Sequence, residues 1–114
     1  MDVLSVLASQ ALTGSGQSSG IYLADPGQSI AVFLNITAWT GAGTIVFAPE
    51  WSYDKSMSTW FAPDTSEAFT SLGVAKKVVR VFPARAPFFR MSWTVTGIVN
   101  ATTEIKAMMR EGAA

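Results

Sequence analysis

The chain has 114 residues and contains neither cysteine nor histidine. Without cysteine it can form no disulfide and has no thiolate nucleophile. Without histidine it lacks the commonest general base and the commonest transition-metal ligand. Any catalytic or metal-binding role would have to rest on carboxylates, hydroxyls and amines, and we expect neither a bound metal nor a cofactor.

Charged residues are also scarce. They make up 14% of the chain, against roughly 25% in an average soluble domain, whereas hydrophobic residues make up 49%. Small polar and apolar side chains must then cover much of the surface, which predicts that part of this surface contacts other protein. The net charge of zero gives no sign of a nucleic-acid partner.

The few charges are unevenly distributed along the chain. Residues 1–67 carry six acidic residues and one lysine, whereas residues 68–114 carry seven basic residues and two acidic ones. In a sandwich whose halves interleave, this asymmetry has no consequence, and this is the interpretation we favour. If the halves formed different faces, copies of the protein could attract one another head to tail.

The N-terminal residues 1–16 do not have the pattern of a secretion signal. Asp2 stands where such a signal would be basic, and Ser5 and Ser9 interrupt the apolar run that follows. The run is also shorter than a membrane-spanning helix requires. The segment therefore predicts neither export nor contact with a membrane.

Short runs of β-branched and aromatic residues recur along the chain, separated by Gly, Pro, Asp and Ser. Turn signals every 8–12 residues or so are typical of an antiparallel β-sandwich or barrel. We therefore predict one all-β domain over residues 1–114, a jelly-roll-like antiparallel β-sandwich of about eight or nine strands. Residues 104–112 also carry a weaker helical pattern. Strands are predicted at residues 3–12, 20–24, 29–39, 44–54, 59–63, 69–73, 74–82, 87–97 and 102–110.

Two of these strands have features of a sheet edge. Residues 1–12 could form an edge strand, or an arm that pairs with the sheet of a neighbouring molecule. Pro49 has no N–H, so the strand over residues 44–54 is either an edge strand or bulged at that point. The alternation of side chains along a strand predicts which residues share a face. It predicts a strongly apolar face at Ile30, Val32, Leu34 and Ile36. It also predicts a core-facing side at Ile45, Phe47, Trp51 and Tyr53, and a shared face for Phe89, Met91, Trp93 and Val95.

No arrangement of residues predicts catalysis. The glycine-rich residues 14–20 lack the spacing of a phosphate-binding loop, so we interpret them as a flexible surface loop. Asp54, Asp64 and Glu67 lack the spacing of a calcium loop and fit solvated turns. No S-x-x-K motif offers a lysine base to a serine nucleophile. We therefore expect no enzymatic activity and no small-molecule substrate.

Basic residues cluster in residues 76–90, KKVVRVFPARAPFFR, with phenylalanines between the cations. Cations between aromatic rings are typical of single-stranded nucleic-acid binding. Here the phenylalanines have strand parity, and Pro83 and Pro87 bracket a turn. We therefore favour a strand–turn–strand whose cations face an acidic protein neighbour, and we expect no nucleic-acid partner.

Residues 50–63, EWSYDKSMSTWFAP, have aromatic residues on both sides of a polar break. We predict a β-hairpin with a polar tip at residues 54–58. Trp60 and Phe61 are adjacent, so only one of them can point inward, and the outward ring is a candidate contact. The alternative is a carbohydrate-binding module that stacks sugars on a platform formed by Trp51, Tyr53, Trp60 and Phe61.

Several stretches resemble motifs of small β-sandwich proteins from the structural gene clusters of tailed bacteriophages. Residues 51–61, WSYDKSMSTWF, are similar to their hairpin of a strand, S-x-D-G-x-x-W and a second strand. Residues 88–97, FFRMSWTVTG, are similar to their Y-x-R-x-x-W-T-V-x-G strand. Residues 33–38 and 102–105 resemble two further strands, so the resemblance covers nearly the whole chain at the level of pattern.

The resemblance implies a bacteriophage virion structural protein, and more specifically a capsid decoration or cement protein. Such a protein is made in the bacterial host cytoplasm, binds the outer surface of the shell of major capsid protein, and associates with copies of itself. The chain departs from the pattern where residues 55–57 replace a glycine-bearing turn and where residues 76–90 are more basic. A phage neck or tail structural protein therefore remains an alternative.

The candidate contact residues lie in the N-terminal strand, in the hairpin and at the basic corner near residues 80–90. In this interpretation the apolar strand adds to a neighbouring sheet edge, and the cations meet acidic patches on capsid or sister subunits. The candidates are Val3, Leu4, Val6, Leu7, Trp60, Phe61, Arg80, Arg85, Phe88 and Arg90.

Overall fold

The computed structural model of the chain describes residues 3–23, 29–64, 67–70 and 75–110. These residues form nine strands and no helix, so the predicted all-β fold is confirmed. In chain order the strands are β1 (Val3–Leu12), β2 (Gly16–Gln17), β3 (Ile21–Tyr22), β4 (Ser29–Thr40), β5 (Thr44–Ser52), β6 (Phe69–Thr70), β7 (Lys76–Pro83), β8 (Phe88–Thr96) and β9 (Asn100–Arg110).

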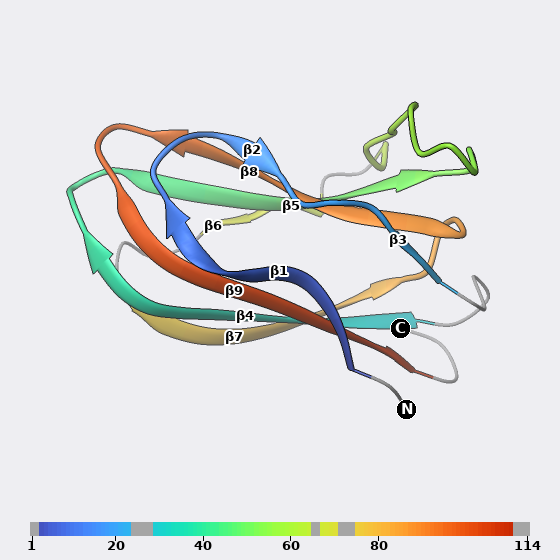
Figure 1. Cartoon of the computed structure of the whole chain (residues 1–114), viewed down its shortest axis with the longest axis horizontal. Helices are drawn as coiled ribbons and strands as arrows, with labels where there is room; N and C mark the ends of the chain where they lie inside the picture. Colours follow the sequence, from blue (N-terminus) through green and yellow to red (C-terminus); the bar gives the residue numbers. More distant parts are fainter. Residues whose placement is uncertain (1–2, 24–28, 65–66, 71–74, 111–114) are drawn as a thin grey trace.

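The strands form two sheets that lie face to face (Figure 1). Sheet A has the strand order β1-β9-β4-β7. Sheet B has the order β2-β8-β5-β6, and β3 pairs with another part of β8. The pairings between the described strands are antiparallel. The predicted antiparallel β-sandwich is therefore confirmed.

Alternation along the long strands builds the core between the two sheets. The predicted apolar face of β4 is buried, and β5 and β8 of sheet B bury their own alternate residues against it. Burial of one large apolar side chain stabilises the fold by about 1.5–3 kcal/mol. The principal core residues of these three strands are Ile30, Val32, Leu34, Ile36, Ile45, Phe47, Trp51, Phe89, Met91 and Trp93.

Tyr53 is the exception to the predicted core face of its strand. Its side chain is 72% exposed, because β5 ends at Ser52 and the chain leaves the sheet before Tyr53 can point inward. Pro49 lies in regular register with Met91 of β8. On the other side of β5, β6 pairs only with Val46 and Phe47, so Pro49 occupies an edge position where no N–H is needed.

The second half of the predicted hairpin is shorter than a strand. Over residues 59–63 only Phe61 pairs, in an isolated antiparallel bridge with Trp51. At the C-terminal end, β9 pairs with both β1 and β4. The helical alternative for residues 104–112 is therefore wrong over its described part, and residues 111–112 lie outside the described residues. Two-sided pairing outweighs the weak helical pattern because it satisfies both edges of the β9 backbone.

The glycine-rich segment after β1 is an edge of sheet B rather than the predicted flexible loop. Gly16 and Gln17 form β2 and pair with Trp93 and Ser92. The Ser18 N–H donates to the Met91 carbonyl at 2.8 Å, and the Ser18 hydroxyl accepts from the Met91 N–H at 3.0 Å. Serine hydroxyls thus supply part of the ladder, which a count of β-forming residues cannot detect.

The two edges of sheet A differ in regularity. Along β1 the register against β9 shifts between Ser5 and Leu7 and again between Leu7 and Gln10. The first shift turns both Val6 and Leu7 into the core, although they are consecutive. In contrast, β7 pairs with β4 without interruption from Lys76 to Pro83. Bulges increase local twist and blunt an edge, so β1 is the less receptive edge.

Two turns at one end of the sandwich carry the chain between the sheets, and they lie side by side (Figure 1). One joins β4 to β5 and the other joins β8 to β9. The Gly43 N–H of the first turn donates to the Ile98 carbonyl of the second at 2.9 Å. Gly41 and Gly97 have positive φ values of 99° and 79°, which side chains with a β-carbon rarely adopt.

The close approach of these turns predicts a specific cost for adding a methyl group. Gly41→Ala should lower the free energy of unfolding by about 2 kcal/mol, because the new β-carbon is strained at positive φ and overlaps the Ile98 carbonyl oxygen. Urea denaturation followed by tryptophan fluorescence measures the change. Gly14→Ala is the control, since a β-carbon there meets nothing within 4 Å, and similar small effects of both variants would contradict the packing of the turns.

Candidate protein-contact surfaces

The outer face of sheet A is built by the residues that alternate with the core residues. On β4 these are Ala31, Phe33 and Asn35, because Val32 and Leu34 point inward, and of the three Ala31 is itself buried. The register of the four strands places their outward side chains in rows across the sheet. The first row is Val81, Ala31, Met108 and Val3, the second is Val79, Phe33, Lys106 and Ser5, and the third is Lys77, Asn35 and Glu104. We call these three rows the sheet-A face.

The first two rows give the sheet-A face an exposed apolar centre. Phe33 is 40% exposed and Val79 is 54% exposed, and Val3 and Val81 are also exposed. Four of the eight exposed large apolar side chains of the described chain thus lie on one face. Contiguous exposed apolar area on a monomer is typical of a binding surface.

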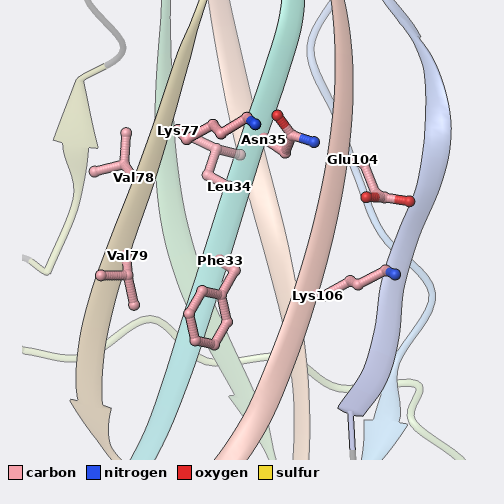
Figure 2. Close-up of a pocket in the computed structure, with 8 residues that line it drawn as sticks. All are labelled: Phe33, Leu34, Asn35, Lys77, Val78, Val79, Glu104 and Lys106. Carbon is pink, nitrogen blue, oxygen red and sulfur yellow. The ribbon is translucent and has the colours of Figure 1, made fainter.

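A shallow hollow of about 370 Å³ lies on this face beside Phe33 (Figure 2). Figure 2 shows Lys77 and Val79 on one side of the Phe33 strand and Glu104 and Lys106 on the other. The Asn35 side-chain oxygen is buried without a hydrogen-bond partner among the described residues. The hollow therefore combines apolar contact with ammonium and carboxylate groups at its borders.

The outer face of sheet B has a different character. Its alternate positions on β5 and β8 hold mainly small or polar side chains, and Ser92 Oγ donates to the Ala48 carbonyl at 3.2 Å. Arg90 donates to Glu50 at 2.6 Å in a pair of largely buried side chains. Of the exposed large apolar residues, this face carries Tyr22, which pairs with Phe88 at one end of the sheet. The two outer faces of the sandwich are thus unequal, and sheet A carries more of the exposed apolar side chains.

The loop after β5 is organised by one carboxylate. Asp54 accepts hydrogen bonds from the Ser58 hydroxyl at 2.6 Å and from the Ser56 hydroxyl and N–H at 2.8 and 3.0 Å. These bonds, led by that from Ser58, lower the pKa of Asp54 to about 2. Met57 follows with a positive φ of 54°. Two backbone bonds between Trp51 and Phe61, at 2.9 and 2.8 Å, close the loop.

The loop places Trp60 and Phe61 on opposite sides of the sheet edge. Trp60 lies half-buried over the guanidinium of Arg90, at 4.5 Å from ring centre to Cζ, and donates to the Met57 carbonyl at 2.9 Å. Gly20 packs against it so closely that a β-carbon would lie 2.8 Å from the indole. Phe61 is 49% exposed and packs against Tyr53 with ring centres 5.6 Å apart. Phe61 is therefore the more exposed of the two rings.

The four rings of the carbohydrate-binding alternative do not form one surface. Trp51 is in the core, where its ring packs against Phe89, and Trp60 lies on the outer side of sheet B. Only Tyr53 and Phe61 share an exposed surface. Beside them is a hollow of about 310 Å³, and the buried Trp51 lines it together with Arg85 and Pro63.

A second pair of rings lies at the same end of the sandwich. Tyr22 packs against Phe88 with ring centres 5.5 Å apart, and Phe88 pairs with Ser52, the residue before Tyr53. A hollow of about 670 Å³ lies beside Tyr22 and Phe88, with Lys55 at its border. We call the four residues Tyr22, Tyr53, Phe61 and Phe88 the aromatic rim. The rim lies at the end opposite the two glycine turns (Figure 1).

The candidate residues of the N-terminal strand are divided between core and surface. Val6 and Leu7 belong to the core and Leu4 is half-buried, whereas Val3 is exposed on the sheet-A face. Burial leaves Val6 and Leu7 unable to contact a partner while the sandwich is folded. Phe88 joins the aromatic rim.

The three candidate arginines each have a partner within the chain. Arg80 lies over the Phe69 ring at 5.0 Å. Arg85 pairs with Glu67 at 2.9 Å, and this hydrogen bond raises the pKa of Arg85. Arg90 pairs with Glu50. The basic corner is therefore not a set of free cations, and the acidic first half of the chain supplies two of the partners.

Apart from Val3, the residues of the sheet-A face were not among the contact residues expected from the sequence. Phe33 belongs to the mixed face of its predicted strand, which gives a weak signal by itself. Its neighbours Val79 and Lys106 lie far away in the sequence and join it only through the strand register. Among the described residues, no group of acidic side chains could hold a metal ion, and no helix there could cross a membrane.

No protein-family model matches the chain, and no curated protein sequence matches it. The function is therefore inferred from the geometry of these surfaces and from the motifs of the sequence.

Removal of the Arg90 guanidinium tests the packing of Trp60. Arg90→Ala should lower the free energy of unfolding by about 2 kcal/mol, because it removes a largely buried ion pair and the contact with the indole. Chemical denaturation measures the loss. Arg85→Ala is the matched control, since the Arg85 side chain is 41% exposed and its ion pair should contribute less than about 1 kcal/mol. Equal losses would contradict a special role for Arg90.

Protonation of Asp54 should loosen the loop in acid. Its folded pKa of about 2 lies below the ordinary value of 3.8, so its contribution is complete above about pH 4 and is lost as the pH falls through about 2. We expect the indole N–H signal of Trp60 in ¹H–¹⁵N spectra to shift over this range. Asp54→Asn should remove the shift, and Asp64→Asn should retain it. A shift that persists in Asp54→Asn would mean that another group controls the loop.

Proposed function

We propose that this protein is a structural protein of a tailed-bacteriophage virion, and specifically a capsid decoration protein. It binds the outer surface of the shell of major capsid protein and stabilises that shell. The observation that carries the proposal is the presence of two separate exposed apolar surfaces, the sheet-A face and the aromatic rim, on one small sandwich of low charge. A protein that holds others together needs more than one contact surface.

The aromatic rim is the surface that we assign to the shell. Aromatic residues dominate the energetics of many protein interfaces because they bury a large area with little loss of side-chain entropy. Tyr53 and Phe61 are exposed but rest on each other, so their positions are fixed before contact. Lys55 beside the second ring pair adds an exposed ammonium group to this end of the molecule, which suits an acidic capsid surface.

Symmetry makes modest contacts sufficient for this role. A shell presents many equivalent sites, and copies that also contact one another bind with an effective concentration set by the lattice. Each contact can then be weak while the assembled layer holds firmly. The resemblance of residues 51–61 and 88–97 to phage β-sandwich motifs agrees with this role.

Two other roles are ranked below this one. A neck or tail protein would use the same surfaces at a few positions instead of a whole shell. A carbohydrate-binding module would now depend on Tyr53 and Phe61, with the largely buried Trp51 at the base of their hollow, because Trp60 does not join this surface. A flat titration of intrinsic fluorescence against a broad glycan panel would remove that role.

The copy number of the protein in purified particles tests the proposal. The particles to measure are those of the phage whose genome encodes this chain. Quantitative mass spectrometry of these particles should find nearly as many copies of this protein as of the major capsid protein. A few copies per particle would instead support a neck or tail position. Absence from the particle would overturn a virion role.

The assignment of the rim to the shell has its own test. Tyr53→Asp should weaken binding to capsid shells that lack the protein by at least about tenfold, the equivalent of about 1.4 kcal/mol. Co-sedimentation with such shells measures the binding. Ile98→Asp is the matched control, because Ile98 is 84% exposed at the glycine-turn end, away from the rim. If both variants bind like the parent, the rim does not face the shell.

A further inference from the structure

We infer that the sheet-A face binds a second copy of this chain, around a two-fold axis that runs along the strands between β4 and β9. The inference rests on the proposed function in treating the sheet-A face as a contact surface, and it names the occupant of that surface. The rows of side chains across the sheet select both the occupant and the axis.

A symmetric pair of face-to-face sheets has few geometric solutions. Identical surfaces meet around a two-fold axis, and packed sheets keep their strand directions within about 30° of each other. The axis must therefore lie in the interface plane, either nearly along the strands or nearly across them. The two orientations bring different rows and strands together.

An axis along the strands places β4 opposite β9 of the second copy and β7 opposite β1 of the second copy. Each row then faces the same row in reverse order. In the first row Val81 meets Val3 of the second copy, and Met108 of the second copy lies over Ala31, which is already buried within its own sheet. These contacts are apolar on both sides.

The same axis matches the polar side chains. In the second row the Phe33 ring meets Lys106 of the second copy, an ammonium–aromatic contact. In the third row the Asn35 amide meets Glu104 of the second copy, which can accept from its Nδ2–H. The Asn35 side-chain oxygen is buried and lacks a partner among the described residues. Lys106 of the second copy lies one row away, so its ammonium group can donate to this oxygen once the amide has rotated.

An axis across the strands places each strand opposite itself and gives poor matches. With the axis at the Phe33 row, Lys77 faces Val81 of the second copy and Glu104 faces Met108 of the second copy. Both charges would lose water without gaining a partner. With the axis at the Asn35 row, Lys77 faces Lys77 of the second copy, which is repulsive. With the axis at the Ala31 row, Lys106 faces Arg110 of the second copy, which is also repulsive. The charge pattern therefore selects the axis along the strands.

The edges of sheet A do not offer an equally good alternative. The β1 edge is bulged at two places, and bulges oppose addition of a strand. The β7 edge is regular but carries Lys76, Lys77 and Arg80, so two β7 edges would repel each other. The face is the larger and better matched surface.

The size of the face predicts a weak dimer. Four strands spaced by about 4.8 Å and eight residues long at about 3.3 Å each cover roughly 20 by 26 Å. Two copies would then bury on the order of 1,000 Å² in total, the low end for specific interfaces. We expect a dimer that dissociates on dilution and is strengthened when copies are concentrated on a shared support.

Cross-linking of purified protein without capsid shells tests the axis, and the absence of natural cysteine makes each thiol unique. Val3→Cys and Val81→Cys alter exposed side chains at the two outer strands. Across the proposed axis these positions face each other at the sheet spacing of about 10 Å. A short bis-maleimide reagent spans this distance, which exceeds the reach of a disulfide.

An equimolar mixture of the two variants should give a covalent dimer at least about fivefold faster than either variant alone. Within either single variant the two thiols of a dimer are also displaced sideways by three strand spacings, roughly 14 Å. Equal rates in the mixture and in one variant alone would overturn the proposed axis. If cross-linking in all samples were no faster than expected from random collisions between monomers, the dimer would be overturned.

Sedimentation velocity gives a second measurement that does not depend on cross-linking. Phe33→Lys should weaken dimerisation at least about tenfold, because it replaces the ring that meets Lys106 of the second copy with a second ammonium group. Thr94→Lys, on the outer face of sheet B, is the matched control and should leave dimerisation unchanged. A parent protein that stays monomeric at millimolar concentration overturns the inference, whereas the copy number in particles decides the proposed function separately.

Discussion

The contact between the two glycine turns is the constraint on which the rest of the sandwich depends. Because the Gly43 N–H reaches the Ile98 carbonyl, the β4–β5 and β8–β9 connections cross between the sheets at one end and side by side. The strands that these connections join are neighbours in each sheet, β4 and β9 in sheet A and β5 and β8 in sheet B. The turn contact also leaves the opposite end free for the loop after β5, so the aromatic rim is positioned by a turn contact at the other end of the molecule.

The sandwich uses several of its few charges internally. Glu50 and Glu67, from the acidic first half, pair with Arg90 and Arg85 from the basic second half. The halves therefore interleave at these positions, which favours the interpretation that the charge asymmetry along the chain has no surface counterpart. The two outer faces still differ in apolar area, because sheet A exposes Phe33 and Val79 outward, whereas sheet B presents mainly small and polar side chains away from Tyr22 and Phe88. In the proposed dimer, this difference decides which sheet faces the second copy.

The long strands and their core faces could be predicted from alternation, since Ile30 to Ile36 and Ile45 to Trp51 follow the period of two. Features that depend on the strand register or on hydrogen bonds of hydroxyl groups could not be predicted from the sequence. A bulge turns Val6 and Leu7 inward together, and Ser18 completes β2 through its side chain. Phe33 was visible on a mixed face, but its row with Val79 and Lys106 requires pairings between segments that are remote in the sequence.

The position of β9 has a consequence for synthesis in the cell. In sheet A, β9 lies between β1 and β4, and it follows every other described strand in the chain. The first strand therefore has no partner in its sheet until the last has left the ribosome, and such non-local pairing folds slowly. The sheet-A face, with Lys106 and Glu104 on β9, comes into existence only at that moment. An interrupted chain would consequently lack a completed sheet-A face and could not enter the proposed dimer through it.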